Sequence, residues 1–204
     1  MRSAVKRKRT IVLDAMGVIF RAEDDVAELL VPFLNKLGST IDTNKLNMLY
    51  KKTSLGQLDV DEFWRELGLS PDVEDEYLAL HELNRGCRDF LSFTRKEGLD
   101  AWCLSNDVSR WSLKLSARYA LKDYFKGFVI SGDIGYRKPS EQAYRCLIDR
   151  IGYVPDLFVD DRAANVSAAQ SIGIRSVLFD ANSDAKYGTV DFDALTDVVG
   201  QCLE

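Results

Sequence analysis

Residues 10–20, TIVLDAMGVIF, decide the fold of this chain. The run at 11–13 is apolar and rich in β-branched side chains, which is typical of a buried strand in a parallel sheet. Asp14 ends the run, and Gly17 allows the chain to turn sharply after it. Ligands of open α/β sheets bind beyond the carboxyl ends of the strands. Asp14 is therefore placed to act as a nucleophile or a metal ligand, or to cap a turn at the strand end.

The second half of the chain alternates between strands and helices. Strands are predicted at 101–104, 127–130, 157–159 and 176–179. One helix is predicted to end near residue 98, and four more are predicted at 107–121, 140–151, 165–172 and 192–203. This alternation favours a mostly parallel sheet with helices on both faces. The sequence therefore predicts an α/β protein with a three-layer, Rossmann-like core.

Between residues 18 and 84 the pattern is helical, without strand signals. Apolar residues recur at helical spacing from Ala22 to Leu37, with Pro32 as an expected kink. Asp59 and Glu62 have the spacing of a capping box. We expect residues 18–84 to form a small helical cap domain, and residues 1–17 and 85–204 to form the core domain.

Composition excludes several classes of protein. The chain has 204 residues, 46% of them hydrophobic and 29% charged, with a net charge of −5. That charge does not indicate nucleic-acid binding, and no apolar run approaches the roughly 20 residues of a membrane span. The basic run from Arg2 to Arg9 precedes no apolar region, so we expect a solvated tail and a cytoplasmic protein. Four cysteines fit no zinc or redox spacing: Cys87, Cys103, Cys146 and Cys202.

Polar residues follow the predicted strands or lie in the loops between elements. They are Asp14, the run Ser105, Asn106 and Asp107, then Lys138, and the pair Asp160 and Asp161. Because the carboxyl ends of parallel strands meet at one edge, we expect these groups to converge. Carboxylates bind hard cations such as Mg²⁺, a lysine and a hydroxyl neutralise phosphoryl oxygens, and a free carboxylate can attack. The combination predicts a phosphate and magnesium site, although each group alone also fits a cap or a surface position.

Three stretches carry a resemblance to a known family. They are GDIGYRKPSEQAYRCLIDRIG at 132–152, DLFVDDRAANVSAAQSIGI at 156–174 and GQLDVDEFWREL at 56–67. With them the chain resembles the haloacid dehalogenase-like (HAD) hydrolase superfamily, in members with a helical cap inserted after the first strand. The resemblance implies that Asp14 forms an aspartyl-phosphate intermediate on a small-molecule substrate. It also implies roles for other residues: Ser105, Asn106 and Lys138 would bind the phosphoryl group, and Asp14, Asp160, Asp161 and the Met16 carbonyl would hold Mg²⁺.

Met16 departs from the pattern that the resemblance implies. Phosphatases of the family usually carry a second Asp there, which protonates the leaving oxygen and then activates water. A thioether cannot transfer protons, and general acid–base catalysis is typically worth ~10²–10⁴-fold in rate. The leading interpretation is a slow or specialised phosphohydrolase. It would prefer acidic leaving groups or take its acid from the cap, where Glu23, Asp24 and Asp25 follow the site.

Three other interpretations stay open. A 2-haloacid dehalogenase needs no acid because halide leaves without a proton, but it would not need Asp160 and Asp161 for a cation. A carbon–phosphorus hydrolase would use a cap lysine as a Schiff base, and the cap offers Lys36, Lys45, Lys51 and Lys52. A non-catalytic protein could keep the Mg²⁺ and phosphate pocket without turnover.

Two further positions carry weaker expectations. Tyr136 and Arg137 flank Lys138 and are candidate substrate contacts. His81, the only histidine, is expected on a cap helix in a structural or exposed position.

Overall fold

The computed structural model describes residues 8–181 and 189–201. Within them, six parallel strands form one sheet in the order β3-β2-β1-β4-β5-β6. The strands are β1 (Thr10–Leu13), β2 (Asp100–Ser105), β3 (Phe125–Ile130), β4 (Leu157–Asp160), β5 (Ser176–Phe179) and β6 (Thr189–Val190). Cys103 in β2 is buried with a free thiol. Arg2, Lys6, Arg7 and Cys202 lie outside the described residues.

Strand β1 lies in the middle of the sheet. Leu13 pairs with Cys103 of β2 on one side and with Val159 of β4 on the other. The chain moves outward from β1 through β2 to β3, then returns and continues through β4 on the opposite side. The order of the strands therefore reverses at β1 and β4, and the carboxyl ends at such a switch point are where open α/β sheets bind ligands.

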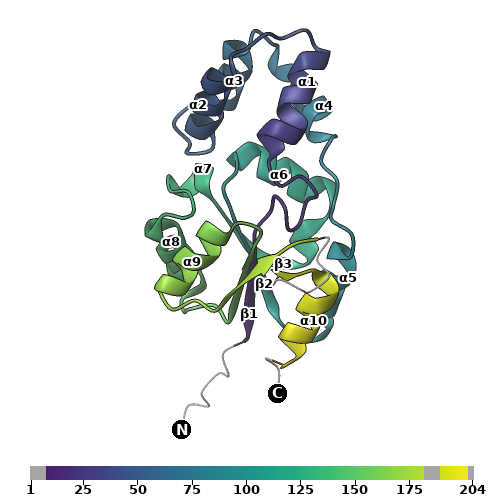
Figure 1. The fold of residues 1–204 in the computed structure, drawn as a ribbon, viewed down its shortest axis with the longest axis vertical. Coiled ribbons are helices and arrows are strands. Elements are labelled where there is room, and N and C mark those ends of the chain that lie inside the picture. Colours follow the sequence, from purple (N-terminus) through teal and green to yellow (C-terminus); the bar gives the residue numbers. More distant parts are fainter. Residues whose placement is uncertain (1–7, 182–188, 202–204) are drawn as a thin grey trace.

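Helices cover both faces of the sheet (Figure 1). Helices α8 (Glu141–Ile151) and α9 (Ala163–Ser171) lie on one face, and α5 (Cys87–Lys96) and α10 (Phe192–Gln201) lie on the other. Successive side chains of β1 point to opposite faces: Val12 belongs to the apolar cluster of Tyr144 in α8, whereas Leu13 belongs to that of Phe90 in α5. The predicted three-layer core is confirmed.

A small helical cap stands beyond the carboxyl ends of the strands (Figure 1). Its elements are the π-helical turn η1 (Val26–Leu30), α1 (Val31–Lys36), α2 (Thr43–Thr53), α3 (Val60–Glu66), the 3₁₀ turn η2 (Pro71–Val73) and α4 (Glu74–Leu78). Trp64 and Tyr77 of the cap pack on Trp111 of α6 (Ser109–Arg118), with ring centroids 5.6 Å and 5.0 Å from that of Trp111. The cap thus shares one apolar cluster with the sheet domain.

The first cap helix begins at Val26 rather than near Ala22, and it is irregular at Pro32, where the sequence predicts a kink. The chain forms η1 before α1, and the Val31 N–H donates to the Val26 carbonyl five residues earlier. Pro32 has no N–H to donate to the preceding turn, so the helical hydrogen-bond pattern is interrupted at that point. The helix predicted from Asp59 is confirmed, because the Asp59 side chain accepts the N–H groups of Asp61 and Glu62.

Three smaller features differ from the sequence-based expectation. His81 lies just after the end of α4, not on a cap helix. Helix α7 (Ser131–Ile134) and strand β6 are too short to leave a periodic pattern in the sequence. Among the described residues, every helix is too short or too polar to cross a bilayer.

Candidate active site

Three carboxylates meet at the carboxyl ends of β1 and β4. Asp14 follows Leu13, which pairs with Val159, so Asp14 comes level with Asp160 at the end of β4. One carboxylate oxygen from each of Asp14, Asp160 and Asp161 lies within 4.8 Å of the others. The parallel register therefore brings together residues that are about 150 positions apart in the sequence.

Lys138 joins two of these carboxylates. Its Nζ lies 2.7 Å from Asp14 Oδ1 and 2.6 Å from Asp160 Oδ2, and its side chain is 1% exposed. Asn106 holds the lysine in place: its Nδ2 donates to the Lys138 carbonyl at 2.8 Å, and its Oδ1 accepts the Lys138 N–H at 2.7 Å. Asn165 Nδ2 donates to both oxygens of Asp160, at 2.9 Å and 3.1 Å. The predicted substrate ligand Asn106 thus also positions Lys138.

Burial and mutual repulsion act against the ionised carboxylates. Burial raises the pKa of Asp14 well above its usual value; Asp160 adds to this shift and Lys138 opposes it. Burial and the Asp160 charge raise the pKa of Asp161 to about 6. Burial alone would lower the pKa of Lys138, but Asp14 and Asp160 outweigh it and raise that pKa. The lysine therefore stays charged.

The Asp161 carboxylate also bears on what the three carboxylates can bind. Its Oδ1 is buried and has no hydrogen-bond partner among the described residues. Buried polar atoms in native proteins almost always have a partner. A buried carboxylate oxygen without one, beside two further carboxylates, is a donor set suited to a hard divalent cation. The residues present therefore fit a Mg²⁺ ion.

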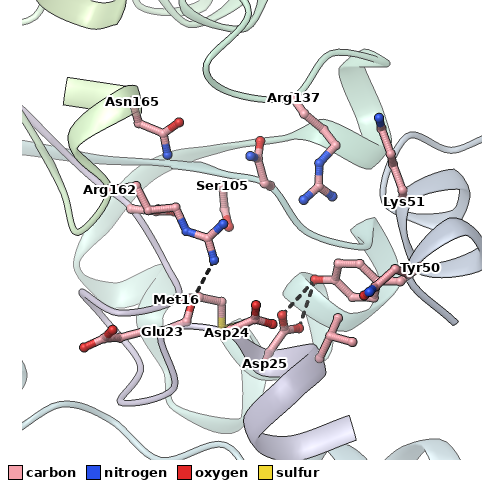
Figure 2. A pocket seen from close by; sticks show the side chains of 14 residues that line it. Met16, Glu23, Asp24, Asp25, Tyr50, Lys51, Ser105, Arg137, Arg162 and Asn165 are labelled. Atoms are coloured by element: carbon pink, nitrogen blue, oxygen red, sulfur yellow. Dashed lines mark hydrogen bonds between the residues drawn. The ribbon is translucent and has the colours of Figure 1, made fainter. Parts of the chain in front are cut away.

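A cavity of about 240 Å³ opens from this cluster toward the cap. Its lining comes from the strand ends, the segment after β1 with the start of η1, the cap helix α2, helix α9 and two loops. The residues are Asp14, Met16, Glu23, Asp24, Asp25, Val26, Asn47, Tyr50, Lys51, Ser105, Asn106, Arg137, Arg162 and Asn165. Figure 2 shows Ser105 and Met16 near the middle of the cavity, with Tyr50 and Lys51 on the α2 side. A cavity of this size suits a small molecule.

Two arginines stand on different sides of the cavity (Figure 2). Arg162 Nη2 donates to the Glu23 carbonyl at 3.0 Å. Arg137 donates to the Ser54 hydroxyl, and its guanidinium lies 5.7 Å from the centroid of the Tyr50 ring. Arg137, a candidate substrate contact in the sequence, lines the cavity. Its neighbour Tyr136, the other candidate, lies outside the lining and is 46% exposed.

The structure brings together seven residues that the sequence suggested for the site: Asp14, Met16, Ser105, Asn106, Lys138, Asp160 and Asp161. Asp107 is expected from the sequence to converge with them, but it is outside the cavity lining. The sequence pattern does not single out Asn165, Arg162 or Tyr50. Asn165 and Arg162 lie inside the conspicuous stretch 156–174, which could have identified them. No signal marked Tyr50, because its place depends on how the cap docks.

Comparisons with known proteins agree with this geometry. A family model of haloacid dehalogenase-like hydrolases matches residues 8–173. A phosphoglycolate phosphatase of Pseudomonas putida is 26% identical over 187 residues, covering 83% of this chain and 68% of that protein. A phosphorylated carbohydrates phosphatase of Thermotoga maritima is 27% identical over 96 residues, covering 46% of this chain and 44% of that protein.

A solved structure gives the same fold. The HAD family enzyme of Bacteroides thetaiotaomicron superposes with a TM-score of 0.74 at 20% identity, covering 88% of this chain and 97% of that one. The same enzyme has been crystallised in complex with magnesium and inorganic phosphate, and that structure has a TM-score of 0.72 at 17% identity, covering 89% and 98% of the two chains. The family match extends over most of the chain, from the strand that carries Asp14 to the helix after Asp161. The chain belongs to the haloacid dehalogenase-like hydrolase family.

Proposed function

We propose that the protein is a small-molecule phosphohydrolase in which Asp14 is the nucleophile. The observation that carries the proposal is the contact set of Asp14. Its Oδ1 lies 2.7 Å from Lys138 Nζ and accepts the Ala15 N–H at 2.6 Å. Two donors thereby fix one oxygen, so the other oxygen is the attacking atom. The names of the two phosphatase relatives suggest the substrate class, phosphorylated organic acids and sugars.

The proposed phosphohydrolase uses Mg²⁺ as its cofactor. Asp14, Asp160, Asp161 and the Met16 carbonyl would hold it, which gives the buried Asp161 Oδ1 a partner. When bound, the ion supplies positive charge that lets a phosphate dianion approach three carboxylates. The unpartnered Asp161 oxygen favours this function over a dehalogenase that works without a metal.

The remaining residues have roles that follow from their positions. An oxygen of Asp14 attacks phosphorus and displaces the leaving oxygen, and water then releases phosphate from Asp14. Lys138 and the Ser105 hydroxyl offset charge on the phosphoryl oxygens. Residues 18–84 would act as a cap domain over a core of residues 1–17 and 85–204. The cap excludes water from the cavity while the substrate is bound.

Hydrolysis of p-nitrophenyl phosphate and acetyl phosphate, with Mg²⁺ or with EDTA, tests the proposal. We expect turnover with Mg²⁺, little with EDTA, and a loss on the order of 10³-fold or more in Asp14→Asn, because the nucleophile is gone. Asp72→Asn, an exposed cap residue outside the cavity, is the matched control. Turnover that survives in Asp14→Asn contradicts the proposal. Stabilisation of the fold by Mg²⁺ and phosphate without any turnover would instead identify a binding protein.

A carbon–phosphorus hydrolase is a second candidate, because Lys51 is the one of the four cap lysines that lines the cavity in the described chain. Lys36 and Lys45 pair with Glu76 and Glu66. In this function the Lys51 amine would condense with a substrate aldehyde and release water. Borohydride would reduce that imine and leave a stable mass increase on Lys51 after incubation with an aldehyde-bearing phosphonate. An unmodified Lys51 under these conditions excludes this candidate.

A further inference from the structure

Met16 leaves the cavity without a proton donor at the usual position, and three acidic residues follow it in the chain. The structure separates the three. Glu23 and Asp24 are exposed, whereas Asp25 is 6% exposed. Figure 2 shows the Glu23 carboxylate directed away from the centre of the cavity and the Asp25 carboxylate directed toward Tyr50. Asp25 is therefore the member of the group with a carboxylate enclosed in the cavity wall.

The hydroxyl of Tyr50 fixes the orientation of Asp25. It donates to Asp25 Oδ1 at 3.1 Å and to Oδ2 at 2.9 Å, and the Tyr77 hydroxyl lies 3.5 Å from Oδ2. Tyr50 lies in α2, and Asp25 directly precedes η1. Their contact therefore joins two cap elements at the cavity. Tyr50 is itself 6% exposed. A carboxyl group held in this way has the fixed position that proton transfer requires.

The surroundings of Asp25 bring its proton equilibrium closer to neutral pH. Burial raises the pKa of Asp25 to about 6, with a further rise from Asp24, while the Tyr50 hydrogen bond and Arg137 oppose the shift. Burial and then the Asp25 charge raise the pKa of Asp107 to about 8. The titratable and charged groups that act on Asp25 from the surrounding elements are Asp24, Tyr50, Tyr77, Asp107 and Arg137.

We propose that Asp25 is the general acid and base that replaces the missing carboxyl group at Met16. The inference rests on the proposed phosphohydrolase function. As the bond from Asp14 to phosphorus forms and the bond from phosphorus to the leaving oxygen breaks, the Asp25 proton moves to that oxygen and gives an alcohol. In the second step Asp25 takes a proton from a water molecule. The oxygen of that water bonds to phosphorus, and the bond from phosphorus to Asp14 breaks. Atoms and protons balance over the two steps.

Tyr50 acts as a positioning residue in this scheme. Its hydrogen bonds to Asp25 strengthen when the carboxyl group loses its proton, because charge-assisted hydrogen bonds are stronger than neutral ones. The Tyr50 hydroxyl therefore stabilises the product side of the first proton transfer. Burial, followed by the nearby Asp25 and Asp107 charges, raises the pKa of Tyr50 well above its usual value, so the hydroxyl keeps its own proton.

The decisive variant is Asp25→Asn, which keeps the size of the side chain and removes the acid. We expect hydrolysis of glycerol 2-phosphate to fall ~10²–10⁴-fold, because an alkoxide leaves poorly without a proton. p-Nitrophenolate needs no proton, so the variant should still release about one equivalent of it in a burst, followed by slow turnover. Asp72→Asn should behave as wild type on both substrates, and urea unfolding of each variant checks the fold.

A rescue variant separates chemistry from damage to the structure. The double variant with Met16→Asp and Asp25→Asn should hydrolyse glycerol 2-phosphate at least tenfold faster than Asp25→Asn alone, because it restores a carboxyl group at the usual position. A structural role of Asp25 would not be repaired by a substitution at Met16.

Tyr50→Phe gives an independent readout. Removing the hydrogen bond that lowers the pKa of Asp25 should move the high-pH fall of kcat/KM for glycerol 2-phosphate to higher pH. Equal losses on both substrates without a burst, no rescue, or an unchanged pH profile would overturn the role of Asp25. Wild type without Asp14-dependent turnover overturns the proposed function as well, so the two failures are distinguishable.

Discussion

Gly17 lies against the metal-ligand candidate Asp161 without a side chain between them. Its backbone has a φ of +75°, and a Cβ atom at this position would lie 2.3 Å from Asp161 Oδ2. An L-residue is strained at that φ, and the added carbon would also displace the Asp161 carboxylate. A side chain at Gly17 would therefore strain the turn after β1 and disturb the carboxylate cluster.

We predict that Gly17→Ala raises the Mg²⁺ concentration needed for half-maximal activity by about 10-fold or more, since displaced supports of metal ligands typically cost that much. The free energy of unfolding should fall by about 1–3 kcal/mol. Activity measured against Mg²⁺ concentration, together with urea unfolding, checks both effects. Gly152→Ala is the control: Gly152 has a φ of +88° with nothing within 4 Å, so the variant should lose stability and keep its Mg²⁺ dependence.

At the scale of elements, Glu74 joins cap helix α4 to core helix α6. The carboxylate is buried, and its Oε2 accepts hydrogen bonds from Trp64 Nε1 at 3.3 Å, Trp111 Nε1 at 2.9 Å and Arg110 Nη2 at 2.7 Å. Lys114 Nζ lies 2.7 Å from Oε1. Burial acts to raise the pKa of Glu74, but the hydrogen bonds from Arg110, Lys114 and Trp111 outweigh it and lower that pKa. The charge is therefore retained at the junction.

We predict that Glu74→Ala lowers the free energy of unfolding by about 2–5 kcal/mol, because it leaves two buried indole N–H groups without their acceptor. It also removes the buried partner of Arg110 and Lys114, which keep only their second partners Asp61 and Asp75. Urea unfolding measures the change. Glu76→Ala on the same helix removes an exposed pair with Lys36 and should cost less than about 1 kcal/mol. Equal costs for the two variants would contradict the role given to Glu74.

At the scale of the whole molecule, His81 links stability to pH. It is 2% exposed, and its ring packs between Phe20 at 6.0 Å and Tyr77 at 5.2 Å between centroids. Its Nδ1 has no hydrogen-bond partner among the described residues. Burial lowers the pKa of His81 to about 4. Between the unfolded value near 6.5 and this value the unfolded chain binds more protons, so stability falls as pH falls.

Two buried acids act in the opposite direction. The raised pKa values of Asp25 and Asp107 mean that the folded protein holds protons which the unfolded chain releases. Their contribution to stability is present at low pH and is lost as pH rises through about 6 and about 8. A comparison with a His81 variant therefore isolates the histidine from these carboxyl groups.

We predict that His81→Phe, which keeps an aromatic ring and cannot bind a proton, gains on wild type as pH falls. The difference in unfolding free energy between the two proteins should change by about 3 kcal/mol from pH 7 to pH 4, in favour of the variant. Urea unfolding at a series of pH values measures it. Parallel stability curves would show that His81 does not carry the predicted linkage.

The sequence by itself determined strands β1 to β5, the helical cap and the residues at the strand ends. Strand β1 could be recognised from its apolar run, and Asp14, Ser105, Asp160 and Asp161 from their places at or after strand ends. These features are local, since strand formation, turns and caps depend on residues a few positions apart. Parallel pairing then makes the strand ends meet, so the convergence of the carboxylates also followed from the pattern.

Only the tertiary structure decided which side chains serve the site from elsewhere. Glu23, Asp24 and Asp25 are alike in the sequence, and docking of α2 buries Asp25 against Tyr50 while the other two stay exposed. Docking likewise selects Lys51 from four lysines and ties Asn106 to Lys138. Burial and partner choice depend on contacts between residues far apart in the chain, and no local pattern of residues encodes them.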